Sequence, residues 1–590
     1  MNRHPMLSKL FAPAFGATRR RRPPARRIGL EPLEDRAMLT AYIVDTDADV
    51  VANDGLISLR EAVEASSTNA PSGDAPAGMA NGDAITFDPS LDGLPIHLML
   101  GELSITDDLL ISGQALDITI DAGGASRVFA IHTGEVVALA HLTLTGGAVA
   151  DDGGAIAAAG GGVTHLRDMR ILDSTASGHG GGGLFIDASM VHIFHSLISG
   201  NTADGATGSG GGILNGPGGR LRVFQSEISE NTANRAGGGI EDNSGAGLGV
   251  TLWHSALEGN NAGVAPAAAA PGNGGGLHVT GPGDVAIFAS RVIGNVAAAE
   301  GGGLWNGTGR MTVVHTVVRE NSASGDAADD GGGGIFNNGG TLFVTWSTIA
   351  HNTADGAAGS GGGIFSNGGH ATIVASRIDG NSANRAGGGI EVVAANVGIV
   401  FSSLAENVAG PVGSAAPGNG GGLHVSGAHS TVRVQSSRVT GNTAASEGGG
   451  LWNDEGSTMN VVASTISRNQ ALGTALDNGG GGIFNNGGVL DIVFSTINWN
   501  SSAGSGGGLF LGDGGHVHIS ASQIFQNEAD ENGGGIYNNA DLVLQFSSVH
   551  HNSAADGGGI YTDTLGITDL VIAFLFGNNP NDLAGPGMVI

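Results

Sequence analysis

The chain has 590 residues, no cysteine, a formal net charge of −30 and 108 glycines. Without cysteine there is no disulfide framework, no thiolate catalysis and no cysteine-based zinc site. The glycines follow no collagen-like period, and 40% of the residues are hydrophobic, too many for a disordered glycine-rich tract. This composition predicts many tight turns between short apolar strands.

The charge is divided unevenly between the first 36 residues and the rest. Residues 1–36 hold nine basic and three acidic groups, which leaves 15 basic and 51 acidic groups in residues 37–590, a net charge of −36. Such a body repels nucleic acid and anionic lipid, so neither is expected as a partner. Loop acids such as Asp329–Asp330 could hold calcium. The calcium-binding nonapeptide repeat is not found, and no cofactor is expected.

Residues 1–40 form a basic N-terminal segment that we expect to be disordered. It contains no apolar run long enough to span a membrane. Its arginine cluster follows a short apolar patch, which is not the order of a standard secretory signal. The stretch "LEPLEDRAML" (Leu30–Leu39) resembles the LEPR-type N-terminal sorting motif of large surface proteins of planctomycete-like bacteria. That resemblance implies export to the cell surface, to the outer membrane or to the medium.

Residues 41–150 are predicted to form an N-terminal cap and the first coils of a repeat fold. "DGLISLREAVEASSTN" (Asp54–Asn69) carries a small apolar helical face, with Ser58 as N-cap and Glu61 three residues later. The stretch resembles the CSLREA motif at the head of exported β-helix proteins, except that Ile57 stands where that family has cysteine. A cap of this kind would cover a strand edge that otherwise invites aggregation.

A glycine cassette repeats through residues 151–579. Two to four glycines are followed by an aliphatic residue, at intervals of 24 to 37 residues, at Ile156, Leu184, Ile213, Ile240, Leu277, Leu304, Ile335, Ile364, Ile390, Leu423, Leu451, Ile483, Leu509, Ile536 and Ile560. Between cassettes, apolar residues alternate with period two, which indicates strands with one buried face. A unit of about 28 residues cannot bury that face alone, but stacked units can.

Each unit also carries an aliphatic-x-x-Asn signature. We expect these asparagines to stack as a structural ladder whose amides bond to turn backbone: Asn201, Asn231, Asn260, Asn295, Asn321, Asn352, Asn381, Asn407, Asn442, Asn469, Asn500, Asn527 and Asn552.

Together the two signatures predict an all-β fold, a single parallel β-helix of about 15 or more coils, with coils roughly 4.8 Å apart. Right-handed winding is expected from the usual hand of parallel crossovers. The units resemble the polymorphic outer membrane protein repeats, although the third cassette residue is usually glycine and aliphatic residues replace phenylalanine before Asn. The fold this implies is the pectate-lyase-like solenoid, or pectin lyase fold. Residues 580–590 are expected to be a C-terminal tail.

A higher-order repeat is visible in the order of the cassettes. Five consecutive cassettes in residues 210–340 recur in the same order in residues 361–488. "APGNGGGLHV" belongs to this block and occurs at 270–279 and 416–425. The pattern indicates a duplicated five-coil block.

The residue after each cassette aliphatic forms a column that contains aromatic residues, glutamate and histidine. If the column faces outward, it is a surface that could bind carbohydrate, because aromatic faces stack on sugar rings. The other interpretation is that the rings stack on one another and rigidify the rod. The candidate binding residues are Glu241, His278, Trp305, Glu391, His424 and Trp452.

A catalytic interpretation has weaker support. Glu241 with His278, and Glu391 with His424, could be acid–base pairs if neighbouring coils bring them together, but their duplication favours copied scaffold. Pectate-lyase-like hydrolases use several Asp residues, a G-H-G and an R-I-K. Here "GHG" occurs at Gly178–Gly180, near Asp151–Asp152, and no R-I-K is present. We therefore name no catalytic residue and no metal ligand.

The sequence leads to one function and one alternative. The expected function is an exported, non-catalytic cell-surface or extracellular β-helical protein, adhesin-like or structural, that binds polysaccharide or other surface components. The alternative is a polysaccharide lyase or glycoside hydrolase. We expect a monomer without a transmembrane segment.

Overall fold

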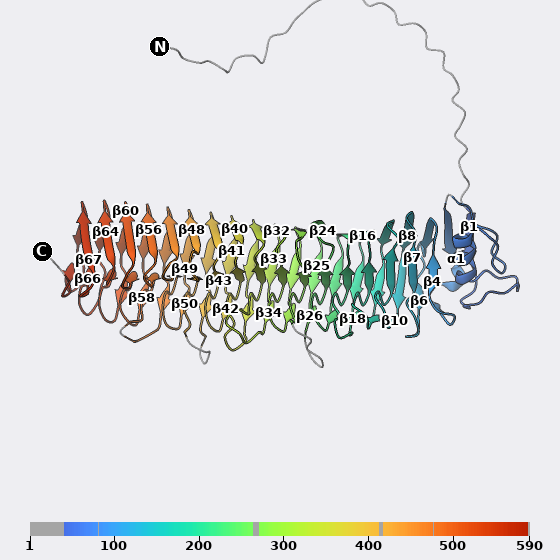
Figure 1. Cartoon of the computed structure of the whole chain (residues 1–590), viewed down its shortest axis with the longest axis horizontal. Helices are drawn as coiled ribbons and strands as arrows, with labels where there is room; N and C mark the ends of the chain where they lie inside the picture. Colours follow the sequence, from blue (N-terminus) through green and yellow to red (C-terminus); the bar gives the residue numbers. More distant parts are fainter. Residues whose placement is uncertain (1–39, 81, 264–270, 412–416, 476, 588–590) are drawn as a thin grey trace, which may run out of the picture. The chain divides into compact units, whose positions relative to one another are not determined.

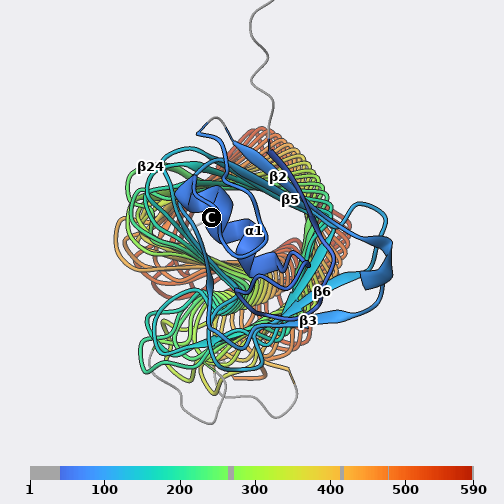
Figure 2. The same ribbon diagram turned by 90° about the vertical axis from the view of Figure 1, so that its right-hand side faces the viewer.

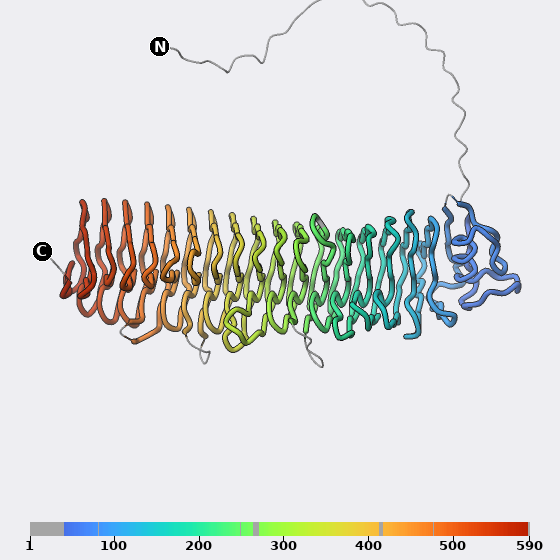
Figure 3. Tube along the Cα trace, viewed as in Figure 1, coloured from blue at the N-terminus to red at the C-terminus, as the bar shows by residue number. Residues whose placement is uncertain are grey.

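The computed structural model describes residues 40–80, 82–263, 271–411, 417–475 and 477–587. Within them, 69 strands stack coil on coil, as Figure 1 shows in ribbon form and Figure 3 as a trace. The predicted all-β, single parallel β-helix is confirmed. The proposed sorting motif and the rest of residues 1–39 lie outside the described part of the chain.

Four strands make up a typical coil, and each belongs to a different sheet. In one coil these are β35 (Ile335–Asn338) in sheet I, β36 (Thr341–Thr345) in sheet II, β37 (Thr348–Ala350) in sheet III and β38 (Thr353–Ala354) in sheet IV. Each strand pairs in parallel with its counterpart in the next coil. Sheet II has 19 strands, sheets I and III have 18 each, and sheet IV has 14.

The fifteen cassette aliphatics open the strands of sheet I, and all of them are fully buried. In sheet II, Leu342 and Val344 point inward while their neighbours are partly exposed, as the period of two predicts. The inward side chains form one continuous core cluster from Tyr42 to Ile560. Equivalent inward-facing residues of successive coils therefore stack into apolar columns that run along the rod.

Close packing between coils explains the cassette glycines. Gly361 adopts a φ of +65°, a left-handed conformation that favours glycine. A Cβ atom on Gly363 would stand 2.6 Å from the carbonyl oxygen of Gly389 and 3.0 Å from the side-chain amide of Asn381. Any larger residue at Gly363 would push neighbouring coils apart.

The asparagines of the second signature form a single buried column at the corner between sheets III and IV. At a typical rung, the backbone N–H and Nδ2 of Asn381 both donate to Oδ1 of Asn407, each at 3.0 Å. Nδ2 also donates to the carbonyl oxygen of Ile349 in the preceding coil, at 3.0 Å. Each rung thus satisfies polar groups in three consecutive coils, and the column continues to Asn578.

Helix α1 (Leu59–Thr68) lies over the N-terminal end of the coil stack, as the end-on view in Figure 2 shows. Ser58 is its N-cap and forms a capping box with Glu61. The helix packs against β1 (Thr40–Val44), β2 (Asp83–Phe87) and β4 (Leu103–Ile105). No described helix is long and apolar enough to cross a membrane.

The last described coil contains β66 (Ile560–Thr562), β67 (Ile567–Val571) and β68 (Phe574–Phe576). After it, β69 (Leu583–Ala584) pairs with β66. The coil stack therefore continues past residue 579, into the segment that the sequence assigned to a tail.

Candidate functional site: two buried Glu–His–Trp clusters and a surface groove

The column after the cassette aliphatics points away from the lumen and is nevertheless largely buried. Its residues are the second positions of the sheet I strands, and each lies against the glycine turn of its own coil. A Cβ atom on Gly274 would stand 2.6 Å from Cβ of His278, and one on Gly301 would stand 3.0 Å from Cβ of Trp305. Glycine turns therefore leave the space that these side chains occupy.

The first cluster joins three consecutive coils through β23 (Ile240–Asp242), β27 (Leu277–Val279) and β31 (Leu304–Asn306). Nδ1 of His278 lies 2.8 Å from Oε2 of Glu241, and the hydroxyl of Thr280 donates to Oε1 of Glu241 at 2.5 Å. The imidazole stacks on the Trp305 ring at 4.3 Å between centroids, 25° from parallel. Glu241 is 2% and His278 4% exposed, so both are shielded from solvent.

A second carboxylate completes this cluster. Oε2 of Glu300 accepts hydrogen bonds from Nε1 of Trp305 at 2.8 Å and from Nδ2 of Asn273 at 2.9 Å. Burial, together with the nearby charges of Asp330 and Asp329, raises the pKa of Glu300 to about 7, although the Trp305 hydrogen bond and His278 oppose the rise. Glu300, which is partly buried, is therefore expected to titrate near neutral pH.

The second cluster repeats this arrangement in β43 (Ile390–Val393), β47 (Leu423–Ser426) and β51 (Leu451–Asn453). Nδ1 of His424 lies 2.9 Å from Oε2 of Glu391, and its ring stacks on Trp452 at 4.3 Å and 20°. Ser426 replaces Thr280 and donates to Glu391 at 3.1 Å. The counterpart of Glu300 is Glu447, which accepts from Trp452 at 2.9 Å, and burial raises its pKa as well.

Aromatic stacking extends both clusters along the rod. Trp305 is parallel to Phe336 at 6.2 Å, and Trp452 is parallel to Phe484 at 6.1 Å. After Phe484 the stack runs on through Phe510, Tyr537 and Tyr561. The column thus forms two small apolar clusters outside the main core, and its burial fits ring stacking that stiffens the rod. It does not fit an exposed face for sugar rings.

The sequence predicted the pairing of Glu241 with His278 and of Glu391 with His424. It did not predict the other residues that contact each pair. Thr280 and Ser426 lie two residues after the histidines, where nothing in the cassette marks them. Glu300 and Glu447 carried a usable signal, because each precedes an identical "GGGLW" in the duplicated block. The clusters join a carboxylate to an imidazole, yet a substrate could reach neither without opening a glycine turn.

The "GHG" stretch is held by hydrogen bonds to Asp152 of the preceding coil. Asp152 accepts the backbone N–H groups of His179 and of Gly180, the latter at 2.9 Å. Its other oxygen lies 3.2 Å from Nδ1 of His179, whose side chain is 80% exposed. Asp152 therefore organises the turn of the following coil.

A surface groove of about 510 Å³ lies along sheet III, in the coils around residues 168–291. His195 lies 3.8 Å from a carboxylate oxygen of Asp168 and 2.8 Å from Oε1 of Gln225. Other charged and polar groups line the groove, among them Arg170, Glu227, His254 and Arg291. Acids, bases and arginines thus converge on a surface that solvent reaches.

The groove differs between the two copies of the duplicated block. Glu227 corresponds to Arg377 and His254 to Phe401, whereas every member of the buried clusters has an identical or chemically similar counterpart. The duplication thus kept the packing of the rod and changed its surface.

Within the described ranges, no three His, Asp or Glu side chains are grouped as metal ligands. Comparisons with protein-family models, with curated proteins and with solved structures gave no significant match for this chain.

Proposed function

We propose that this protein is an exported, non-catalytic rod of the bacterial cell surface, structural or adhesin-like. The continuous hydrogen-bonded stack carries the proposal: one core cluster runs from Tyr42 to Ile560, and one asparagine column runs from Asn201 to Asn578. A stack of this kind holds surface groups at fixed spacing along a rigid axis. The buried clusters act as part of its packing.

Three further features support an exported surface role. The segment before the rod is basic and ends in "LEPLEDRAML", which resembles a sorting motif. The body is strongly acidic, which favours solubility. The absence of cysteine removes any dependence of the fold on the redox state of its compartment.

Fractionation of the producing cells tests the location. The full chain is expected with the envelope or the medium, and a chain that lacks residues 1–36 is expected to stay in the cytoplasm. Equal distribution of the two chains between the fractions would contradict the assignment of residues 1–36 to export.

The groove on sheet III supports a second candidate, a polysaccharide lyase or glycoside hydrolase. Asp168 and Glu227 are carboxylates of the kind that act as general acid or base, and His195 lies beside Asp168. Arginines beside them suit an acidic sugar chain.

A panel of neutral and acidic polysaccharides, with and without calcium, separates the two candidates. The rod proposal predicts no new reducing ends and no unsaturated products. The enzyme candidate predicts cleavage that Asp168→Asn and His195→Ala both abolish. A matched control is His516→Ala, an exposed histidine in β60 (His516–Ser520), far along the rod from the groove.

A further inference from the structure

The corner between sheets II and III carries large apolar side chains in a conformation that does not favour them. Trp346, Phe401, Phe494 and Phe546 have φ values of 47°, 52°, 52° and 50° and are 58%, 66%, 69% and 55% exposed. Glycine and asparagine suit such a position, whereas a bulky residue there is an outlier. Neither local conformation nor core packing requires these rings, and exposed apolar rows of this kind mark interaction surfaces.

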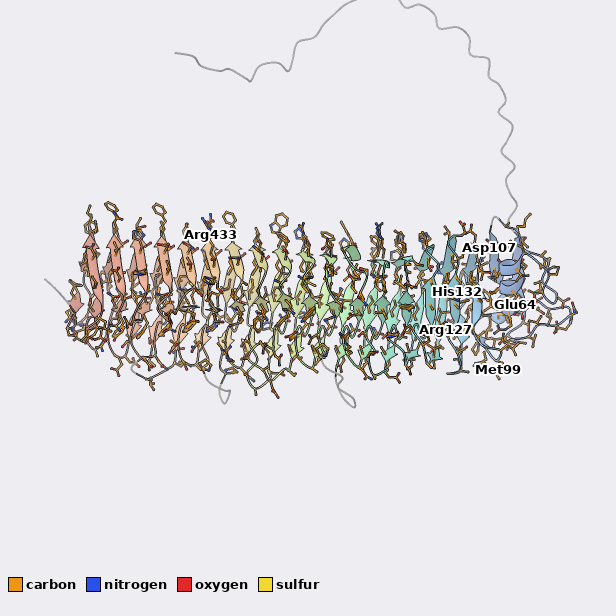
Figure 4. The ribbon with its side chains drawn as sticks, in the orientation of Figure 1. Glu64, Met99, Asp107, Arg127, His132 and Arg433 are labelled. Carbon is orange, nitrogen blue, oxygen red and sulfur yellow. The ribbon has the colours of Figure 1, made fainter. Side chains whose placement is uncertain are left out.

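These rings belong to a strip of nine consecutive corner positions, which we call the corner strip. Coil-to-coil hydrogen bonds link neighbouring members, for example from the N–H of Phe494 to the carbonyl of Ser520, next to Ala521. In coil order the corner strip consists of Trp346, Ala375, Phe401, Ser436, Ala463, Phe494, Ala521, Phe546 and Ile572. Large and small side chains alternate from Trp346 to Ser436 and from Ala463 to Phe546, and the large Ile572 ends the corner strip. In Figure 4, ring-bearing side chains stand off the upper edge of the rod, on which Arg433 is labelled.

When a second copy of the corner strip is placed antiparallel to the first, the phenylalanines of each copy meet small side chains of the other. We infer that two copies of this chain associate side by side and antiparallel through the corner strip, about a two-fold axis at Ala463. Every phenylalanine then faces a small residue of the other copy, in the pairs Phe401 with Ala521, Phe494 with Ser436, and Phe546 with Ala375. The ends of the corner strip bring Trp346 against Ile572. Self-complementary contact of this type is what a closed two-fold interface requires.

The spacing of the rings supports this interleaving. Coils repeat at about 4.8 Å, so alternating rings from two copies would lie about 5 Å apart. Rings in the buried column of this same rod stack at 4.6 Å between Phe484 and Phe510 and between Phe510 and Tyr537. A two-fold axis parallel to the rod would instead place each ring against the same ring of the second chain. The spaces beside the small residues would then stay unfilled.

Charges beside the corner strip obey the same symmetry. Arg433 in β48 (Thr431–Gln435) and Asp491 in β56 (Val489–Val493) lie one coil to either side of Asn460 on the outward face of sheet II. An antiparallel pair centred on the coil of Asn460 and Ala463 places each Arg433 opposite Asp491 of the other copy. Within one chain, Arg433 donates to Gln435 and Asp491 lies 3.8 Å from His518, so the two are not paired with each other.

The size of the corner strip suits a dimer. Nine coils span about 40 Å, and six residues across the corner add a width of about 20 Å, which gives about 800 Å² on each chain. The acidic body opposes association of two copies, because each carries a net charge of −36 after residue 36. Salt screens that repulsion, so the dimer should be more stable at high ionic strength.

Sedimentation equilibrium of the full chain at two salt concentrations tests the inference. The wild-type chain is expected to dimerise, more tightly at the higher salt, and Phe401→Asn with Phe494→Asn is expected to weaken the dimer at least tenfold. Asparagine accepts the left-handed conformation, so the fold is retained, which the thermal transition verifies. The matched control is Trp253→Asn, which removes a ring that is 45% exposed outside the corner strip and should leave the dimer intact.

A charge swap tests the register of the two copies. Arg433→Asp alone and Asp491→Arg alone are expected to weaken the dimer, and the double variant is expected to restore it. Nitroxide labels on single cysteines give an independent reading, since the natural chain has none. Two labels at Thr465 should lie close together, whereas two at Ser548 should be offset by about 30 Å along the rod, six coils at 4.8 Å each.

A wild-type chain that stays monomeric at every concentration and salt would overturn the inference, whether or not the corner strip binds a glycan or another protein. A dimer that survives the double asparagine variant, or equal label distances at Thr465 and Ser548, would overturn it as well. None of these outcomes depends on where the protein resides in the cell.

Discussion

Buried polar side chains on neighbouring coils of the rod stabilise one another through direct contacts. His278 satisfies the carboxylate of Glu241, and Trp305 covers the imidazole. A buried carboxylate that loses its partner retains the full cost of its desolvation. The histidine therefore matters mainly because Glu241 is present in the preceding coil.

Replacing His278 alone should harm the rod more than replacing the pair. His278→Leu leaves the buried Glu241 with the Thr280 hydroxyl as its remaining side-chain partner, and we expect a loss of about 3 kcal/mol in local stability. Glu241→Leu with His278→Leu should cost clearly less, because no charge is stranded. Hydrogen exchange of the amides in β23 and β27 measures both, with the exposed His370→Leu as control. Equal losses for the single and double variants would contradict this account.

Glu300 makes the stability of the rod depend on pH. Its pKa rises from 4.5 to about 7 on folding, so between these values the folded chain holds a proton that the unfolded chain has lost. The free energy of unfolding therefore falls as pH increases through this window. We expect Glu300→Gln with Glu447→Gln to remove about 1–3 kcal/mol of this fall.

Denaturant unfolding at pH 5 and at pH 7.5 measures that difference. Glu455→Gln, at an exposed carboxylate, is the control and should follow the wild-type chain. Identical pH slopes for the double variant and the wild-type chain would show that Glu300 and Glu447, which are partly buried, do not titrate in this range.

At the scale of the element, the coil is the unit that carries stability, and the asparagine column ties each coil to the next. Asn381 accepts two hydrogen bonds from Asn352 and donates to two further groups. Its loss would leave buried donors and acceptors without partners on both sides.

Asn381→Ala should therefore destabilise the coils next to it by about 3 kcal/mol, since each unsatisfied buried group costs about 1–3 kcal/mol. Asn396→Ala, at an exposed position in β44 (Asn396–Val400), is the control and should have little effect. Hydrogen exchange resolved along the chain locates the change. Faster exchange at the distant ends of the rod, with none near β41 (Arg377–Asp379), would argue against a local role.

Much of the coil could be predicted from the sequence because its signals are local. Alternation of apolar residues marked the inward positions, and the spacing of cassettes marked the coils. The burial of His278 and Trp305 could not be predicted, because it depends on how the glycine turn folds over sheet I. The corner strip gave no signal either, since phenylalanine at Phe494 contradicts the usual preference for glycine or asparagine at a left-handed position.

At the scale of the whole molecule, the residues that pack the rod are different from those that form its surface, and the two sets vary independently. The duplicated block preserved the buried Glu–His–Trp clusters and changed the groove and corner residues, as the replacement of His254 by Phe401 shows. A scaffold of this kind can vary its surface without loss of the fold, because side chains outside the core contribute little to stability. That property suits the proposed role, the presentation of a surface outside the cell.

Immunogold labelling of intact producing cells tests the central claim most directly. Antibodies against the rod, residues 40–587, should label intact cells as strongly as permeabilised ones, and cells whose chain lacks residues 1–36 should be labelled only after permeabilisation. Labelling of the full chain that appears only after permeabilisation would contradict an exported surface rod.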